Sequence, residues 1–162
     1  VDPGAFGGVE LADRLLYMTG SGSGRGTLMQ LRDGAVNSED AGLGPVSAFR
    51  ASREWLVWRS DGDASLHAAP LPSLQPVQDI ASDDDGEAFA LVGSTLYFVD
   101  HNRLRMMTLP DGAPSDVVEP RLPSGNGPAV AASADGALAV VALVSVNIDL
   151  MISDAATTAP KR

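Results

Sequence analysis

A glycine-rich stretch, Gly20–Gly26 (GSGSGRG), is a first candidate for a chemical site. Closely spaced glycines let backbone N–H groups approach a phosphate, as they do in nucleotide-binding loops. The spacing here does not fit, because Arg25 or Thr27 occupies the position of the third glycine in Gly-x-Gly-x-x-Gly, and no Gly-Lys-Ser/Thr follows. The stretch is therefore predicted to be a flexible hairpin loop, and no cofactor site is predicted.

An acidic cluster, Asp83, Asp84 and Asp85, precedes Gly86 and is a candidate calcium site. Calcium prefers carboxylate oxygens, but an EF-hand-type loop needs alternating Asp positions and a distant Glu, which the cluster lacks. The favoured interpretation is a solvated acidic turn, with calcium binding as the alternative.

His67 and His101 are the two histidines, too few for a zinc site in a chain without cysteine unless carboxylates complete it. A Ser-His-Asp triad would need a nucleophile, and the Gly-x-Ser-x-Gly elbow of α/β-hydrolases is absent. No catalytic residue is predicted, and the chain is expected not to be an enzyme.

Two tryptophans and two arginines are candidates for an interaction surface. Trp55 and Trp58 are three residues apart, so on a strand they face opposite sides. One is expected in the core, and the other is either an exposed contact or a packing residue between blades. Trp58, together with Arg103 and Arg105, is the predicted interaction surface.

The formal net charge is −10, which argues against binding to nucleic acid or to an anionic membrane surface. No apolar run of about 18 residues occurs, so no membrane insertion is expected. The absence of cysteine excludes disulfides and cysteine nucleophiles. It leaves the compartment open, with a periplasmic or extracellular location favoured over the cytoplasm. Because the chain begins at Val1, we expect a processed or excised segment.

The elements that would position these residues are strands. In Ala132–Asp154, a Ser-x-Asp-Gly turn leads into the apolar run Ala137–Val146, and a second alternating run, Ile148–Ile152, follows. Apolar β-formers bounded by such turns are typical of an antiparallel hairpin, and Ala51–Pro70 is a weaker copy. Since no segment of a dozen residues has a capped helical stripe, the fold class is predicted to be all-β.

The strands repeat with a period of about 40 residues. In one series of strands, the first residues of successive strands are 40, 40 and 42 positions apart. In a second series, formed by the strand that follows each of these, they are 38, 38 and 46 positions apart. The first series is Leu15–Met18, Trp55–Trp58, Thr95–Phe98 and Ala137–Val140; the second is Thr27–Leu31, Ser65–Ala69, Arg103–Met107 and Asp149–Ser153. Such a period predicts repeated units rather than a single irregular sheet.

The predicted architecture is a β-propeller of about four blades of roughly 40 residues, covering 1–40, 41–79, 80–120 and 121–162. A β-sandwich is the alternative. In the third unit, Glu87–Val92 is predicted to be the inner strand. The proline-rich segment Pro70–Gln78 suits only an edge strand or a connector.

The pattern of Ser133, Asp135 and Gly136, followed by an apolar strand and by Asp149–Ile152, resembles the TolB-like propeller repeat, and Ala81–Val92 repeats its turn. Related blades form the propeller of the prolyl oligopeptidase and dipeptidyl peptidase families. The usual proline before the Asp is absent from both copies. The resemblance implies a bacterial propeller fragment.

Four blades are few for a TolB-like ring, and an open ring exposes strand edges and apolar faces. We therefore expect a larger ring, completed by further sequence, by a second copy or by another chain. The favoured function is a non-catalytic scaffold for protein recognition or assembly, with a protein partner or self-association. The alternatives are the substrate-gating propeller of a larger prolyl-oligopeptidase-like hydrolase and a carbohydrate-binding propeller.

Overall fold

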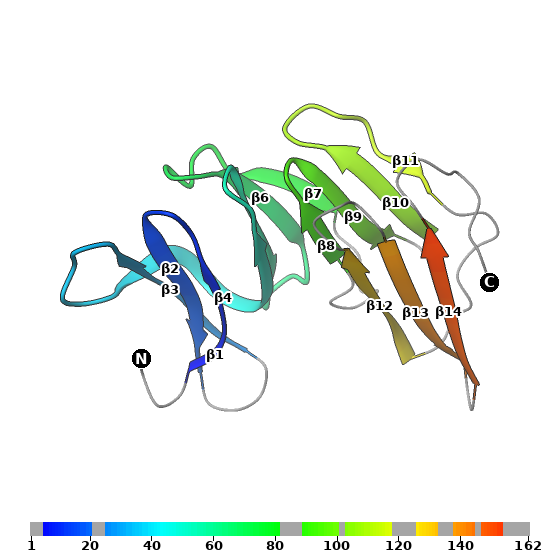
Figure 1. Cartoon of the computed structure of the whole chain (residues 1–162), viewed down its shortest axis with the longest axis horizontal. Coiled ribbons are helices and arrows are strands. Elements are labelled where there is room, and N and C mark those ends of the chain that lie inside the picture. Colours follow the sequence, from blue (N-terminus) through cyan, green and yellow to red (C-terminus); the bar gives the residue numbers. More distant parts are fainter. Residues whose placement is uncertain are drawn as a thin grey trace. The chain divides into compact units, whose positions relative to one another are not determined.

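The computed structural model describes residues 5–20, 25–81, 89–100, 103–117, 126–132, 138–144 and 147–153, and these are arranged as fourteen strands (Figure 1). The described residues include no helix that could cross a membrane. The strands are β1 (Ala5–Glu10), β2 (Arg14–Thr19), β3 (Gly26–Arg32), β4 (Glu39–Ala51), β5 (Trp55–Ser60), β6 (Leu66–Pro70), β7 (Gln78–Ala81), β8 (Phe89–Val92), β9 (Thr95–Asp100), β10 (Arg103–Thr108), β11 (Ser115–Asp116), β12 (Asn126–Ala132), β13 (Leu138–Val144) and β14 (Asn147–Ser153).

The chain divides into two compact units, Val1–Ser82 and Asp83–Arg162. In the first unit, β1 to β7 follow one another in sequence order across one antiparallel sheet. The second unit holds a four-stranded sheet, β11-β10-β9-β8, and a three-stranded sheet, β12-β13-β14. Within that unit, β12 lies beside β8 and β9 (Figure 1). Within each of the three sheets, strands that follow one another in sequence pair with one another, as in a meander.

The two series of repeated strands are confirmed. The first series forms β2, β5, β9 and β13, and the second forms β3, β6, β10 and β14. The predicted inner strand of the third unit is also a strand, with β8 covering its described part. The proline-rich segment is a connector leading into the edge strand β7, as predicted. The predicted limits of the four units stay a prediction.

Strand β4 is the longest and belongs to two groups of strands. Its first part pairs with β3, as at Met29 and Asp40, and its second part pairs with β5, as at Phe49 and Trp58. The pairing shifts register on both sides, where β-bulges let a strand bend. The sheet of the first unit thus consists of two four-stranded groups that share β4. We call β1 to β4 the first blade and β4 to β7 the second blade.

The core of the first unit lies on one face of this sheet. Cross-strand partners share a face, and the register pairs Phe49 with Trp58 and Leu56 with Ala69. The same cluster includes residues of the first blade, so the two blades enclose one apolar core. Its buried members are Leu16, Met18, Leu28, Val46, Phe49, Leu56, Trp58, Ala69 and Leu74.

The core of the second unit is built around β9, whose residues Leu96 to Val99 are all buried. Phe89 and Leu104, on the neighbouring strands β8 and β10, are 2 % and 0 % exposed. Four consecutive buried residues mean that both faces of β9 are covered, since successive side chains point to opposite faces. A strand buried on both faces is what a blade packed between two neighbours requires.

Candidate functional site

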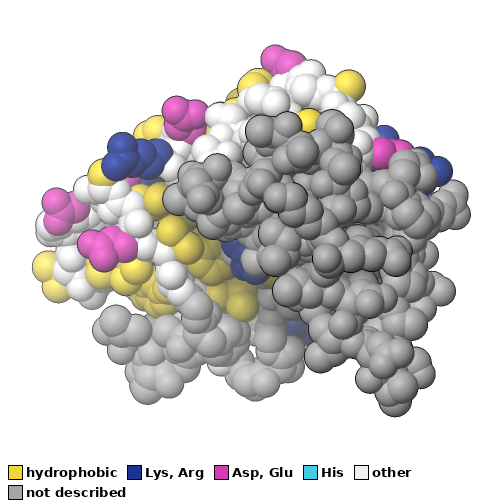
Figure 2. All heavy atoms as spheres, turned by 45° about the vertical axis from the view of Figure 1, so that its right-hand side comes forward, with side chains coloured by type: hydrophobic (Ala, Val, Ile, Leu, Met, Phe, Trp, Pro, Cys, Tyr) yellow, Lys and Arg dark blue, Asp and Glu magenta, His cyan; other side chains and the backbone are white. Residues whose placement is uncertain are grey.

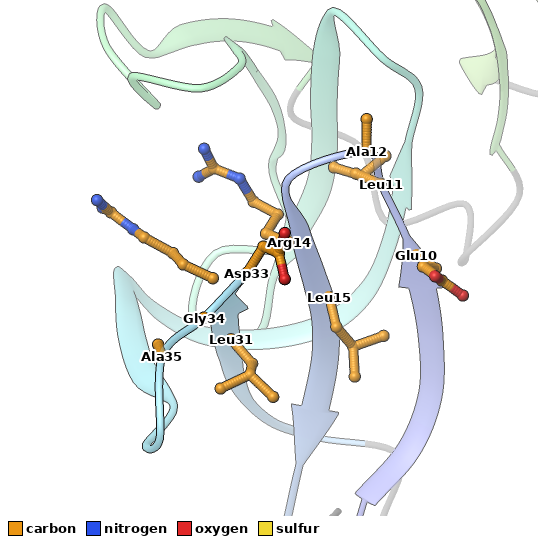
Figure 3. Close-up of a pocket in the computed structure, with 10 residues that line it drawn as sticks. Glu10, Leu11, Ala12, Arg14, Leu15, Leu31, Asp33, Gly34 and Ala35 are labelled. Atoms are coloured by element: carbon orange, nitrogen blue, oxygen red, sulfur yellow. The ribbon is translucent and has the colours of Figure 1, made fainter.

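A hollow of about 540 Å³ lies at one end of the first blade, between the β1–β2 and β3–β4 connections (Figure 3). Its floor includes the apolar side chains of Leu15 and Leu31, which lie on the same face of β2 and β3. Asp33–Gly34 forms a turn there, and Gly34 has a φ of +76°, in the left-handed region that favours glycine. The lining residues are Glu10, Leu11, Ala12, Arg14, Leu15, Leu31, Arg32, Asp33, Gly34 and Ala35.

Arg14 is the buried charged residue of this hollow, with 4 % of its side chain exposed. Its Nη2 donates to Oδ2 of Asp13 over 2.6 Å, and its Nε lies 3.1 to 3.2 Å from both carboxylate oxygens. Its Nη1 donates to Oε1 of the buried Gln30 over 3.0 Å and to the carbonyl oxygen of Pro72 over 3.4 Å. All three guanidinium nitrogens are therefore engaged by acceptors of the chain itself.

The contacts of Arg14 join two blades. Gln30 lies on β3 of the first blade, whereas Pro72 lies in the connection after β6 of the second. Leu74 in that connection is buried in the shared core. A guanidinium with its donors satisfied in this way holds structure and is not free to bind an anion. Arg14 is thus a structural residue beside the hollow, and sequence analysis did not single it out.

Asp13 gives the first testable prediction, because its hydrogen bond from Arg14 lowers the pKa of its carboxyl below the usual 3.8, although burial acts in the opposite direction. A lowered pKa in the folded state contributes stability above the unfolded pKa, and this stability is lost as pH falls through the folded value. Asp13→Asn is therefore expected to cost stability at pH 6 and to cost progressively less below about pH 4. Urea midpoints at both pH values measure this, and a cost unchanged between them would contradict it.

His67 forms a small cross-strand cluster with Trp58 and Asp79. Its Nδ1 lies 2.8 Å from Oδ1 of Asp79, the residue opposite it on β7, and its ring stacks on Trp58 with centroids 5.4 Å apart. The indole and the carboxylate fix the orientation of the imidazole. The geometry orients a histidine without bringing a described Ser, Thr or Tyr hydroxyl into hydrogen-bond contact with it.

The place of Trp58 corrects one part of the predicted interaction surface. Trp58 is 3 % exposed and packs in the core of the first unit, so it offers no contact surface. Trp55, on the other face of β5, is also buried, at 9 %. The prediction that the two tryptophans face opposite sides is right, but both sides of this strand are covered.

Arg103 and Arg105, the other members of that predicted surface, lie on β10 and form ion pairs with aspartates. Arg103 pairs with Asp116 on β11, and Arg105 pairs with Asp100 on β9. Nε of Arg105 also lies 3.4 Å from Oδ1 of Asp116, which links the pairs into one network. The arginine side chains are 37 % and 31 % exposed, so the network lies at the surface. Its role in binding stays a prediction.

Several other candidates fall outside the described residues. These are the calcium candidates Asp83, Asp84 and Asp85, as well as His101 and the centre of the glycine-rich loop. The ends of that loop are described, and a Cβ at Gly26 would overlap the carbonyl oxygen of Thr19, so close backbone approach explains this glycine. The described residues include no group of three His, Asp or Glu that could hold a metal ion.

The surface of the described part shows charged side chains as separate small groups, with apolar side chains gathered between them on the face seen in Figure 2.

No protein-family model matches the chain, and no curated protein is similar to it in sequence. Solved structures are similar in fold, and they are β-propeller proteins. The chain has the fold of propeller blades, as predicted, rather than that of the alternative sandwich.

Regucalcin from Agrobacterium tumefaciens, a calcium-binding protein, is 14% identical, with a TM-score of 0.61 over 93% of this chain and 57% of that one. Hsv2 from Kluyvelomyces marxianus is 15% identical, with a TM-score of 0.59 over 95% of this chain and 48% of that one. The extracellular domain of a hybrid two-component system protein of B. thetaiotaomicron is 14% identical, with a TM-score of 0.55 over 91% and 20%. The chain spans about half the length of the first two.

Proposed function

We propose that the chain is a non-catalytic propeller segment that acts as an assembly and protein-recognition scaffold, with its ring completed by blades from outside the chain. The observation that carries this proposal is the share of each similar structure that the chain matches. Over 90% of this chain matches regucalcin and Hsv2, but it matches only 57% and 48% of their lengths. A propeller removes exposed blade faces by closing its ring, so half a ring requires further blades.

The surface network of β9, β10 and β11 supports a recognition role. Arg103 and Arg105 hold their guanidinium groups at a partly exposed sheet surface, with Asp100 and Asp116 fixing their orientation. Arginine is enriched in protein interfaces, and a pre-oriented side chain loses less entropy on binding. We place the recognition surface there. We also propose that the blades are TolB-like repeats, on the turn and strand pattern of the sequence.

The carbohydrate-binding alternative is not supported. Such a propeller would bind sugar through exposed aromatic side chains, and both tryptophans are buried. The hydrolase alternative would need an α/β-hydrolase domain beside this segment. Neither alternative is favoured by a contact among the described residues.

Light scattering across a concentration series, combined with binding of a hydrophobic dye, tests the proposal. We expect either an assembly larger than the monomer, or a folded monomer that binds the dye through an open blade face. A cooperatively unfolding monomer that binds no dye at any concentration would be a closed domain, and it would overturn the proposal.

A further inference from the structure

The first blade has a core face and an opposite face that the described residues cover less completely. Leu16 and Met18 of β2 are buried in the core that the two blades of the first unit share. Leu15, next to Leu16 on the same strand, belongs to the opposite face and is half-buried. Its partner across the strands, Leu31 of β3, is half-buried as well. We call this opposite face of β1 to β4 the outer face.

The strand register gives the outer face an apolar centre. Leu15 lies opposite Leu31, and Tyr17 lies opposite Met29 on the same two strands, so the four residues share one face. Tyr17 is 6 % exposed, and Met29 is half-buried. Figure 3 shows Leu15 and Leu31 on the same side of their strands, beside the hollow of about 540 Å³. The outer face is therefore apolar at its centre and hollowed at one end.

Carboxylates flank this apolar centre. Glu10 of β1 is the register partner of Leu15, and Asp40 of β4 is the register partner of Met29, so both lie on the outer face. Both are exposed, as is Asp33, which lines the hollow in the connection after β3. The outer face thus has an acidic residue on its first strand, another on its fourth strand and a third beside the hollow.

The basic residues nearby do not balance these carboxylates. Arg14 is buried, and its guanidinium is engaged by Asp13 and Gln30. Arg32 also lines the hollow, but it directly follows Leu31 on β3, so its position belongs to the other face of that strand. The whole chain carries a formal net charge of −10. An apolar surface with acidic margins complements a ligand whose apolar side chains are flanked by positive charges.

The separation of the two acidic margins fits the width of a helix. Glu10 is on the first strand of the blade and Asp40 on the fourth. Neighbouring strands are about 4.8 Å apart, so these two strands are separated by about 14 Å. An α-helix with its side chains is about 10–12 Å in diameter. A helix lying along β2 and β3 would place an apolar stripe on Leu15 and Leu31 and a row of side chains toward each margin.

We propose that the outer face of the first blade binds an amphipathic helix of a partner protein, in which lysine or arginine flanks the apolar stripe. The stripe packs on Leu15 and Leu31, an apolar side chain enters the hollow, and basic side chains pair with Glu10 and Asp40. Packing of an amphipathic helix on an apolar groove is a recurring mode of protein recognition. This inference rests on the recognition role proposed above, adds a second surface to it and names the chemistry of the partner.

A short peptide of leucine and lysine, with the leucines at helical spacing, is the probe. Its binding is followed by fluorescence anisotropy at about 0.15 M salt. We expect it to bind at least about tenfold more tightly than a peptide with glutamate in place of lysine, which reverses the complementary charge. We expect the same preference over a peptide with alanine in place of leucine, which removes apolar contact area. Equal binding of the two lysine peptides would mean that net charge alone attracts them, and would overturn the inference.

Two variants locate the contact on the outer face. Glu10→Gln combined with Asp40→Asn removes both flanking charges and keeps the side-chain shapes, so it should weaken binding of the leucine–lysine peptide at least about threefold. Leu31→Ser removes apolar contact beside the hollow and should weaken it about five- to tenfold. Tryptophan fluorescence in urea shows whether each variant is folded.

Each variant has a matched control. Glu54→Gln combined with Asp111→Asn removes the same number of charges at exposed residues in the connections after β4 and β10. Val36→Ser changes an apolar residue that is 94 % exposed. Both controls should leave the dissociation constant unchanged. If the charge control weakened binding as much as the outer-face variant, the carboxylates of the outer face would have no special part in binding, and the inference would be wrong.

A cysteine placed on the outer face reports the location of the peptide directly, because the chain has no cysteine of its own. Leu15→Cys should form a disulfide by exchange with a leucine–lysine peptide that carries a cysteine, activated as a pyridyl disulfide, in its apolar stripe. Val36→Cys should react far less. Equal reaction of the two variants would contradict binding at the outer face.

The other possible occupant of the outer face is a second copy of this chain. A dimer that Leu31→Ser dissociates, together with no binding of the leucine–lysine peptide, would assign the outer face to that copy and overturn the inference. The scaffold proposal would stand in that case, since it is judged by assembly and dye binding. A cooperatively unfolding monomer that binds neither dye nor peptide would overturn both.

Discussion

Trp58→Ala is expected to destabilise the first unit by about 3–5 kcal/mol, the usual cost of removing a buried aromatic side chain. Trp58 is 3 % exposed and packs beside Phe49 and Leu56 in the core that the first two blades share. Its ring also covers His67. The substitution therefore removes packing from both blades and leaves a cavity that the sheet cannot readily close.

The chain offers a local probe for this measurement. Its two tryptophans both lie on β5, so Trp55 remains as a fluorescent reporter of the first unit in the variant. We expect the urea midpoint followed by fluorescence to fall by about 2 M, given an unfolding slope of about 1–3 kcal/mol per M. Trp58→Phe should recover part of the loss, because it keeps an aromatic ring in the core.

Val36→Ala is the matched control for apolar truncation, since Val36 is 94 % exposed. This substitution should change the free energy of unfolding by less than about 0.5 kcal/mol. If Trp58→Ala unfolded at the same urea concentration as the parent chain, Trp58 would not be a core residue. Its predicted place in an interaction surface would then become the better interpretation.

The period of 40 residues made most of the strands predictable. Each repeated strand has apolar residues bounded by Gly, Asp or Asn, and the strands were found at β2, β5, β9 and β13. The first part of β4 was missed because its sequence, EDAGLG, has the composition of a loop. Gly42 and Gly44 there have φ values of +73° and +75°, and backbone pairing with β3 makes this segment a strand.

The candidate site was less predictable, because it depends on register. A sequence shows that Trp55 and Trp58 face opposite sides of a strand, but not that both sides are covered. The pairing of His67 with Asp79 crosses a proline-rich connector, and no local pattern sets how the strands on its two sides align. For Arg14, the sequence shows a possible partner only in the adjacent Asp13. Its contacts with Gln30 and Pro72 come from tertiary structure and cannot be read from the sequence.

Arg14→Met is expected to destabilise the first unit by about 2–3 kcal/mol. Methionine keeps an unbranched apolar side chain but removes the hydrogen bonds to Asp13, Gln30 and Pro72. Each bond from a charged donor contributes about 1.5–3 kcal/mol, and a buried acceptor left without a partner costs about 1–3 kcal/mol. Solvent reduces the share of Asp13, whose side chain is 61 % exposed, so the buried amide of Gln30 accounts for much of the effect.

Arg32→Met is a closely matched control, because Arg32 lies directly opposite Arg14 in the pairing of β2 with β3 and is exposed. The Arg32→Met substitution should change the free energy of unfolding by less than about 0.5 kcal/mol. It should raise stability slightly if anything, because it removes the positive charge opposite Arg14. Equal effects of the two substitutions, measured by urea unfolding, would show that the burial of Arg14 contributes nothing.

A second substitution separates the lost hydrogen bond from lost packing. If Gln30 is destabilised by the loss of its donor, replacing both residues by apolar ones should cost less than the two single changes together. We therefore expect Arg14→Met with Gln30→Leu to recover about 1 kcal/mol relative to additivity. Strict additivity would mean that the two side chains act independently. The joint between the first blade and the second would then depend on the apolar core and not on this polar contact.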